Sequence, residues 1–108
     1  MLPLGNACFY ILVALADSER HGYAIIKEVE ETTRGTIKLG PGTLYRVIKQ
    51  LVADGWIVET ERDDDDTRRR TYGLTPWGRT IAKAEAARLS DLLRLAERRR
   101  LLPALARS

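Results

Sequence analysis

One short segment of the chain carries residue types that could bind a nucleic acid. The segment GPGTLYRVIKQL, residues 40–51, has apolar residues every three or four positions, as in a helix with one buried face. Its other face presents Thr43, Tyr45, Arg46 and Lys49. Basic side chains can bind phosphates and base edges, and hydroxyl groups can donate to phosphate oxygens. Because Gly42 has no side chain, the amides of the first turn could also approach a phosphate closely.

Each of these side chains has an ordinary alternative. Arg46 and Lys49 could be the solvated face of a surface helix, and Tyr45 could lie flat against the helix instead of donating to a phosphate. The order of the neighbouring elements bears on this choice, because it decides whether the polar face belongs to a known DNA-reading arrangement.

A second charged group follows this segment. Residues 56–62 and 68–74 are typical of two short strands, and Asp63–Asp66 lie between them, which predicts a hairpin. Its arginines, Arg68, Arg69 and Arg70, could contact phosphates while the acidic tip, which phosphates repel, points away. The alternatives are insertion of the arginines into a minor groove and a solvated tip whose opposite charges screen one another. A cation site among the aspartates is disfavoured, because consecutive side chains of a strand point to opposite sides.

Helices are predicted before the hairpin. Residues 4–16 are apolar on almost every face, and residues 22–33 carry a helical apolar stripe opposite charged residues. The segment TIKL, residues 36–39, predicts a short strand, and Pro41 suits the first position of a third helix. This order is that of a winged helix-turn-helix, a mainly α fold of the α+β class whose recognition helix enters a DNA major groove.

A fourth, long helix is predicted after the hairpin. Thr75 is a capping residue, Pro76 suits the first helical position, and the helix is expected to run to about Arg100. Its apolar residues are spaced as in a coiled-coil seam, formed by Ala82, Ala86, Leu89, Leu93 and Ala96, with Leu92, Leu95 and Leu102 as a second stripe. The sequence therefore divides into a winged-helix part, residues 1–75, and a C-terminal dimerisation helix, residues 76–108, within one structural unit.

Two segments carry more apolar surface than one small domain can cover. The helix over 4–16 is hydrophobic all round, and the long C-terminal helix has nothing of its own to pack against. We therefore expect a homodimer with Phe9, Leu12, Leu89, Leu93 and Ala96 at its interface. A pocket there for a small aromatic or hydrophobic effector is a further hypothesis, with Cys8, Tyr10 and Trp77 as its lining. Packing in the core or at an interface is the default role of Trp77, and also of Trp56.

The composition narrows the classes of protein to which the chain could belong. The 108 residues suffice for one domain, and no apolar run approaches the roughly 20 residues that a membrane span needs. The N-terminal apolar stretch lacks a basic region before it and is interpreted as a helix, not a signal peptide. One cysteine and one histidine make a disulfide, a metal site or a catalytic pair unexpected, so we expect no enzyme and no cofactor. A reducing cytoplasm suits a single thiol.

The net charge of +3 is too small for a general attraction to nucleic acid. The balance is zero over residues 1–58, −2 over 59–78 and +5 over 79–108. Any DNA contact must therefore depend on the local placement of arginine and lysine.

Three motifs, in this order, resemble those of the PadR family of transcriptional regulators. They are HGYAI at 21–25, GPGTLYRVIKQLVADGWI at 40–57 and RRRTYGLTPWGR at 68–79. The single C-terminal helix is similar to that of the short subfamily. The resemblance implies a winged-helix homodimer that binds an inverted repeat in double-stranded DNA and represses or otherwise regulates genes, often in response to a small molecule.

The resemblance also implies particular DNA contacts, made by Thr43, Tyr45 and Lys49 and by the wing arginines. Two positions depart from the family pattern. Gly40 stands where serine is common, so a hydroxyl that could bind phosphate is missing. Arg46 stands where proline is common, so it could contact DNA in a way particular to this chain. The alternative function is a winged helix that binds proteins and never reads DNA, but such a module would more often carry apolar residues on this face.

Overall fold

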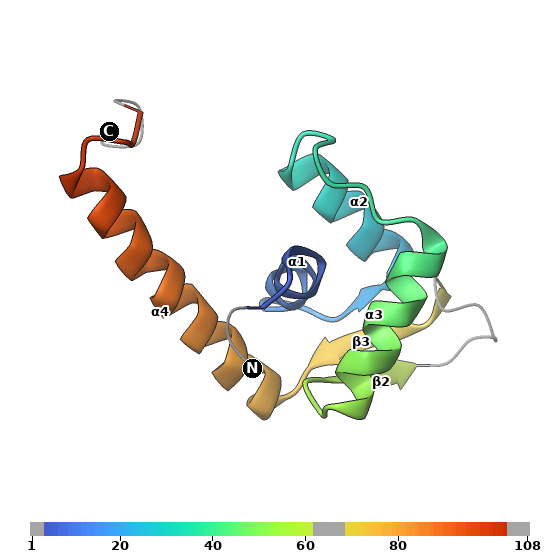
Figure 1. The fold of residues 1–108 in the computed structure, drawn as a ribbon. Coiled ribbons are helices and arrows are strands. Elements are labelled where there is room, and N and C mark those ends of the chain that lie inside the picture. Colours follow the sequence, from blue (N-terminus) through green and yellow to red (C-terminus); the bar gives the residue numbers. More distant parts are fainter. Residues whose placement is uncertain (1–3, 62–68, 104–108) are drawn as a thin grey trace.

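Four helices and a three-stranded antiparallel sheet make up the part of the chain that the computed structural model describes, residues 4–61 and 69–103 (Figure 1). In chain order they are α1 (Asn6–Ala14), β1 (Arg20–His21), α2 (Gly22–Thr32), α3 (Pro41–Ala53), β2 (Ile57–Glu61), β3 (Thr71–Leu74) and α4 (Pro76–Arg98). The expected fold, mainly helical with a hairpin after the third helix, is confirmed. Among these described residues no helix is long and apolar enough to cross a membrane, and no cluster of three potential metal ligands occurs.

The sheet has the strand order β1-β3-β2, so β3 lies in its centre. β2 and β3 form the predicted hairpin, but the third strand is not where the sequence predicted it. Residues 36–39 form no strand, and Arg20–His21 pair with β3 instead. The prediction was wrong because the Thr33 hydroxyl accepts a hydrogen bond from the amide of Ile37 at 3.0 Å, so this segment turns locally after α2 and pairs with no strand.

The hydrophobic core lies where α1, α2, α3 and the sheet meet. Its largest fully buried apolar and aromatic side chains are Ile11, Leu12, Ile25, Val29, Leu44, Leu51, Ile57 and Tyr72. Leu12 is a correction to the expected dimer interface. It has no exposed surface, because the core of its own chain encloses it, so it offers nothing to a partner. Trp56 is buried in the same core, as expected.

α4 begins against the winged head, meaning the elements from α1 to β3, and then leaves it (Figure 1). The buried residues of α4 are Gly78, Ile81 and Glu85, all in its first half, whereas Leu92 and Leu93 are each 54% exposed. The radius of gyration is 15.1 Å, compared with about 13 Å for a compact domain of this length. The second half of α4 therefore projects beyond the head and leaves apolar side chains uncovered.

Candidate nucleic-acid interface

The two faces of α3 differ as the sequence predicted. Leu44, Ile48 and Leu51 are buried in the core, whereas Tyr45, Arg46 and Lys49 are exposed. The Lys49 Nζ atom lies 5.9 Å from the centroid of the Tyr45 ring, within the range of a cation–π contact. Tyr45 is half exposed, so its ring supports the lysine and keeps a surface open to solvent. The outward face of α3 is thus basic and partly ordered by contacts along the helix.

The N-terminus of α3 is open. Gly40 is the N-cap and Pro41 occupies the first turn, as expected, and no side chain caps the helix there. A Cβ added to Gly40 or Gly42 would meet no atom of the chain within 4 Å. Glycine at these two positions is therefore not required by packing inside the chain, and it leaves the first-turn amides accessible to an incoming anion. Thr43, the next residue, is half-buried.

A groove of about 170 Å³ separates α3 from the hairpin. It is lined by Tyr45, Ile48, Lys49, Val52, Glu59, Arg70 and Tyr72. The structure therefore brings the predicted helix residues Tyr45 and Lys49 together with one predicted wing residue, Arg70. The Arg70 side chain is only 16% exposed, and its Nε atom lies 3.8 Å from Glu59 Oε1 on the neighbouring strand. Arg70 thus braces the hairpin from within the groove.

Of the other two wing arginines, only Arg69 lies within the described residues. Arg69 is exposed at the end of the hairpin. Arg68 and the acidic tip Asp63–Asp66 lie outside the described residues, so their predicted roles remain predictions.

Arg46 faces a second groove, on the side of α3 next to α1. This groove, about 430 Å³, is lined by Leu4, Gly5, Cys8, Arg46, Val47, Gln50, Leu51, Asp54 and Trp56. Gln50 Nε2 donates to Asp54 Oδ1 at 3.0 Å, so the acidic end of the groove is already engaged.

Burial raises the pKa of the Cys8 thiol, which lines this groove, and the nearby carboxylates of Asp54 and Glu85 raise it further. Cys8 is thus a protonated, unreactive thiol at neutral pH.

The three residues predicted to line an effector pocket are not brought together within one chain. Cys8 lines the groove beside Arg46, whereas Tyr10 lines a groove of about 360 Å³ between α1 and α4. Phe9 and Leu89, both predicted at the dimer interface, also line the groove between α1 and α4. Trp77 is half exposed in the first turn of α4.

Sequence reasoning missed a buried carboxylate in α4. Glu85 is 1% exposed and accepts hydrogen bonds from Arg88 Nε at 2.6 Å, from Arg88 Nη2 at 3.1 Å and from the amide of Leu4 at 2.9 Å. The Arg88 hydrogen bonds, helped by the Leu4 amide, lower the pKa of Glu85 against the opposing effect of burial. The available signal was an acidic residue on the apolar side of the helix, with a basic residue three positions later.

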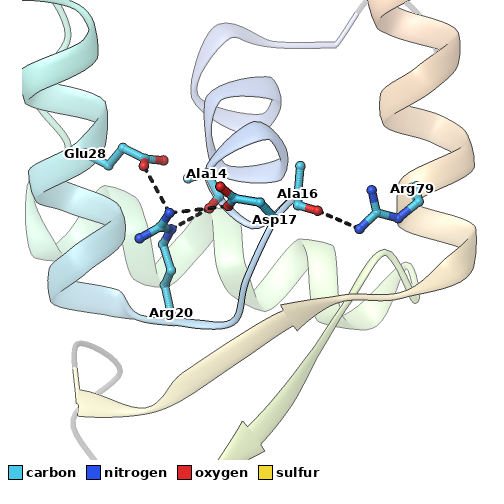
Figure 2. Close-up of polar contacts among 6 residues, drawn as sticks. All are labelled: Ala14, Ala16, Asp17, Arg20, Glu28 and Arg79. Carbon is cyan, nitrogen blue, oxygen red and sulfur yellow. Dashed lines mark hydrogen bonds and ion pairs between the residues drawn. The ribbon is translucent and has the colours of Figure 1, made fainter.

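Sequence reasoning also missed two arginines that meet the end of α1 from opposite sides. Figure 2 shows Arg20 donating from Nε to the carbonyl oxygen of Ala14 at 2.6 Å, and Arg79 donating from Nη2 to that of Ala16 at 2.6 Å. Arg20 also pairs with Asp17 and Glu28, each at 3.3 Å. A helix C-terminus carries unsatisfied carbonyls and partial negative charge, so cations are favourable there. Arg79 reaches this site from α4, far along the sequence.

Comparisons with known proteins agree with this arrangement. A sequence profile of the transcriptional regulator PadR-like family matches residues 11–84. The chain is similar to the transcriptional regulator Rv3488 of Mycobacterium tuberculosis, with 36% identity over 85 residues that cover 79% of this chain and 77% of that protein.

Two solved structures show the same fold. A PadR family transcription regulator from Clostridium difficile has 23% identity and a TM-score of 0.73 over 87% of this chain and 97% of its own. Bacillus subtilis PadR, solved in complex with operator DNA, has 22% identity and a TM-score of 0.63 over 76% of this chain and 47% of its own.

Proposed function

Because the chain belongs to the PadR-like family of transcriptional regulators, we propose that it is a homodimeric repressor that binds an inverted-repeat operator in double-stranded DNA. A transcriptional regulator is not an enzyme, so the candidate sites above are binding surfaces. The proposal has three parts, namely DNA reading by α3 and the hairpin, pairing of two chains through α1 and α4, and release by a small molecule.

The observation that carries the DNA-reading part is the outward face of α3. It exposes Tyr45, Arg46 and Lys49, and the sequence has no acidic residue from 41 to 53. The helix N-terminus beside this face is opened by two glycines that the fold itself does not need. A winged helix places this helix in the major groove, where arginine and lysine read base edges and amides bind phosphates. The B. subtilis relative, solved on operator DNA, has the same fold and supports this docking.

Pairing of two chains is supported by apolar surface that one chain leaves open. Leu92 and Leu93 are half exposed on the projecting half of α4, and Val13 is half exposed on α1. Phe9 and Leu89 line the groove between those helices. A second copy that packs its α4 along this surface would cover them and would give two α3 helices related by a two-fold axis, which an inverted repeat requires.

Release by a small aromatic or hydrophobic molecule rests on the same groove between α1 and α4. Tyr10 and Phe9 give it an aromatic wall, and the Arg88 side chain, which is 38% exposed, lies at its edge. A molecule bound there would contact the helices that pair the two chains, and it could change the angle between the heads.

A winged helix that binds only proteins is the second candidate. The exposed face of α3 is basic, whereas a protein-binding face would be expected to carry apolar or aromatic residues at its centre. Tyr45 is the one aromatic residue there, and it is covered in part by Lys49.

The test is selection of DNA by the purified full chain from random duplexes, followed by affinity measurements at several salt concentrations. We expect an inverted repeat to be enriched and the affinity for it to fall steeply as salt rises. Lys49→Ala should weaken this binding, whereas Lys83→Ala, which removes an exposed charge from α4, should not. Failure to bind any duplex more tightly than unrelated DNA would reject the proposal in favour of the protein-binding alternative.

A further inference from the structure

The first turn of α4 is fixed to the turn between α3 and β2. The Thr75 amide donates to the carbonyl oxygen of Trp56 at 3.1 Å, and the Thr75 hydroxyl donates to that of Gly55 at 2.6 Å. Gly78 packs directly on the Trp56 backbone, where an added Cβ would overlap the carbonyl group. These contacts are all within one turn of the start of α4, so they fix where the helix begins. They form a pivot and do not by themselves set the direction of the helix.

A further contact from the same turn, made by Arg79, reaches a different element. Arg79 extends from α4 to the carbonyl oxygen of Ala16, at the end of α1 (Figure 2). On the other side of α1, Arg20 donates to the Ala14 carbonyl and pairs with Glu28 of α2, which attaches this end of α1 to α2 within the head. The α1 terminus therefore connects the head to α4 through two arginines. A third contact, from the Leu4 amide to Glu85, braces α4 against the segment that precedes α1.

From this arrangement we propose that Arg79 is a positioning residue that sets the spacing of the two operator half-sites. The inference rests on the proposed function, because it concerns a dimer that reads DNA with two α3 helices. If two chains pair through α4, the angle between α4 and its own head determines the separation of these helices. Arg79 acts on this angle from the surface, because its contact with Ala16 is exposed, whereas Gly78, Ile81 and Glu85 of the same helix are buried.

A small change in the angle between α4 and its head is sufficient to change the preferred half-site spacing by one base pair. Arg79 and Leu93 are about 21 Å apart along the helix at 1.5 Å per residue. A swing of about 9° at Arg79 would therefore move Leu93 relative to the head by about 3.4 Å, the rise of one base pair. One base pair also rotates a half-site by about 34°, because a turn of B-DNA takes about 10.5 base pairs. A rigid joint should accordingly discriminate between neighbouring spacings, and a looser one should not.

The test uses a series of duplexes that carry the half-site selected by the wild-type chain, with the separation increased or decreased one base pair at a time. The wild type should bind one spacing about tenfold more tightly than its neighbours, which corresponds to about 1.4 kcal/mol. Arg79→Ala should bind several spacings with affinities within about threefold of one another, and Arg79→Lys, which can still donate to the Ala16 carbonyl, should restore much of the preference. Lys83→Ala is the matched control, with the same charge removed from the next turn of α4.

A second measurement does not depend on DNA. A spin label at Ala53→Cys, an exposed position at the end of α3, in a Cys8→Ser background, reports the distance between the two α3 helices of a dimer. We expect Arg79→Ala to broaden this distance distribution and Lys83→Ala to leave it unchanged. If Arg79→Ala keeps both a narrow distribution and the wild-type spacing preference, or weakens binding to every spacing equally with a narrow distribution, the positioning role is wrong. If the wild type binds no duplex selectively, the proposed function fails, and the distance distribution alone decides whether Arg79 positions the heads.

Discussion

Gly78 lies directly against the backbone of Trp56, so that a Cβ at residue 78 would overlap the Trp56 carbonyl oxygen and lie 2.7 Å from its carbonyl carbon. This contact joins the first turn of the projecting helix to the turn that follows α3. The same carbonyl oxygen accepts a hydrogen bond from Thr75. The close approach therefore requires glycine at residue 78, and α4, with its proposed dimer surface, is joined through backbone atoms to the turn that follows α3, the helix proposed to read DNA.

Gly78→Ala is therefore expected to destabilise the fold. The added methyl group can be accommodated only by moving α4 away from the Trp56 carbonyl, an overpacking that costs about 1–3 kcal/mol. Urea unfolding at neutral pH measures this loss. Gly42→Ala is the matched control, because it is the same substitution in the first turn of α3, where a Cβ meets no atom within 4 Å. It should leave the free energy of unfolding unchanged or raise it by up to about 1 kcal/mol. Equal effects of the two substitutions would contradict the packing described for Gly78.

The stability of the fold is expected to depend on pH because of Glu85. Its pKa is lowered below its ordinary value of 4.5 in the folded chain, chiefly by Arg88. The folded state therefore binds this proton less readily than the unfolded state does. The stabilisation is fully present above pH 4.5 and is lost as the pH falls through the lower pKa of the folded chain.

Glu85→Gln tests this dependence. The variant should unfold at lower urea concentration than the wild type at pH 7, and the difference between the two should shrink below about pH 4. Glu97→Gln, at an exposed position of the same helix, is the control and should show no such convergence. If the urea concentrations at which Glu85→Gln and the wild type unfold differ by a constant amount from pH 7 to pH 3, the charge of the Glu85 carboxylate is not what stabilises the packing of α4 on the head.

The local part of the fold could be predicted from the sequence because its signals are local. Pro41 and Thr75 occur where the structure begins α3 and α4. The apolar stripe of α3 predicted a face of five residues, of which Leu44, Ile48 and Leu51 are buried, whereas Val47 is half-buried and Val52 is 42% exposed. The two-residue strand β1 has no such signal. Its pairing with β3 depends on where α1 and α2 place Arg20 and His21, so the more strand-like residues 36–39 were chosen wrongly.

The contact between α4 and the head that Arg79 makes could not be predicted from the sequence, for a related reason. Arg79 and Ala16 are distant in sequence, and the acceptor is a backbone carbonyl, which any residue provides. Leu12 was assigned to the dimer interface because α1 is apolar all round, and periodicity alone cannot decide which side of such a helix faces the core. Arg69 and Arg70 are likewise the same residue type, although the backbone just before β3 places Arg70 in the groove and leaves Arg69 exposed.

These two arginines are expected to differ in function. Arg70→Ala should lower the free energy of unfolding by about 1 kcal/mol, because Arg70 is largely covered and pairs with Glu59 across the hairpin. Arg69→Ala should lower stability less than Arg70→Ala does, because Arg69 is exposed, and should weaken DNA binding for all sequences alike, with a shallower salt dependence. Thermal unfolding and binding at several salt concentrations separate the two effects. Reversal of the pattern would place Arg70, and not Arg69, on the DNA backbone.

The dimer surface proposed on α4 can be tested by placing a charge in it. Leu93 is 54% exposed in the single chain, so Leu93→Asp should leave each chain folded and should separate the two chains. Sedimentation at micromolar concentration should give a dimer for the wild type and a monomer with unchanged helical content for the variant. Ala87→Asp, exposed and outside both apolar stripes of the helix, should remain dimeric. A monomeric wild type would reject the interface.

Arg46 and Lys49 are expected to contribute to DNA binding in different ways, because they face different grooves. Lys49 lies over Tyr45 beside the hairpin, where a phosphate strand would pass, so Lys49→Ala should weaken binding to every sequence and lower the salt slope by about one unit. Arg46 extends from the other side of α3, next to α1, and lines the groove there. If it binds a base in a bidentate manner, Arg46→Ala should cost about 1–3 kcal/mol at one or two base pairs and should relax specificity there.

Selection of operators with the Lys49→Ala and Arg46→Ala variants measures both effects, and unfolding experiments should show that their stability is unchanged. Unaltered affinity and specificity in both variants would mean that the exposed face of α3 is a solvated surface, and the DNA-reading surface would then have to lie elsewhere on the head.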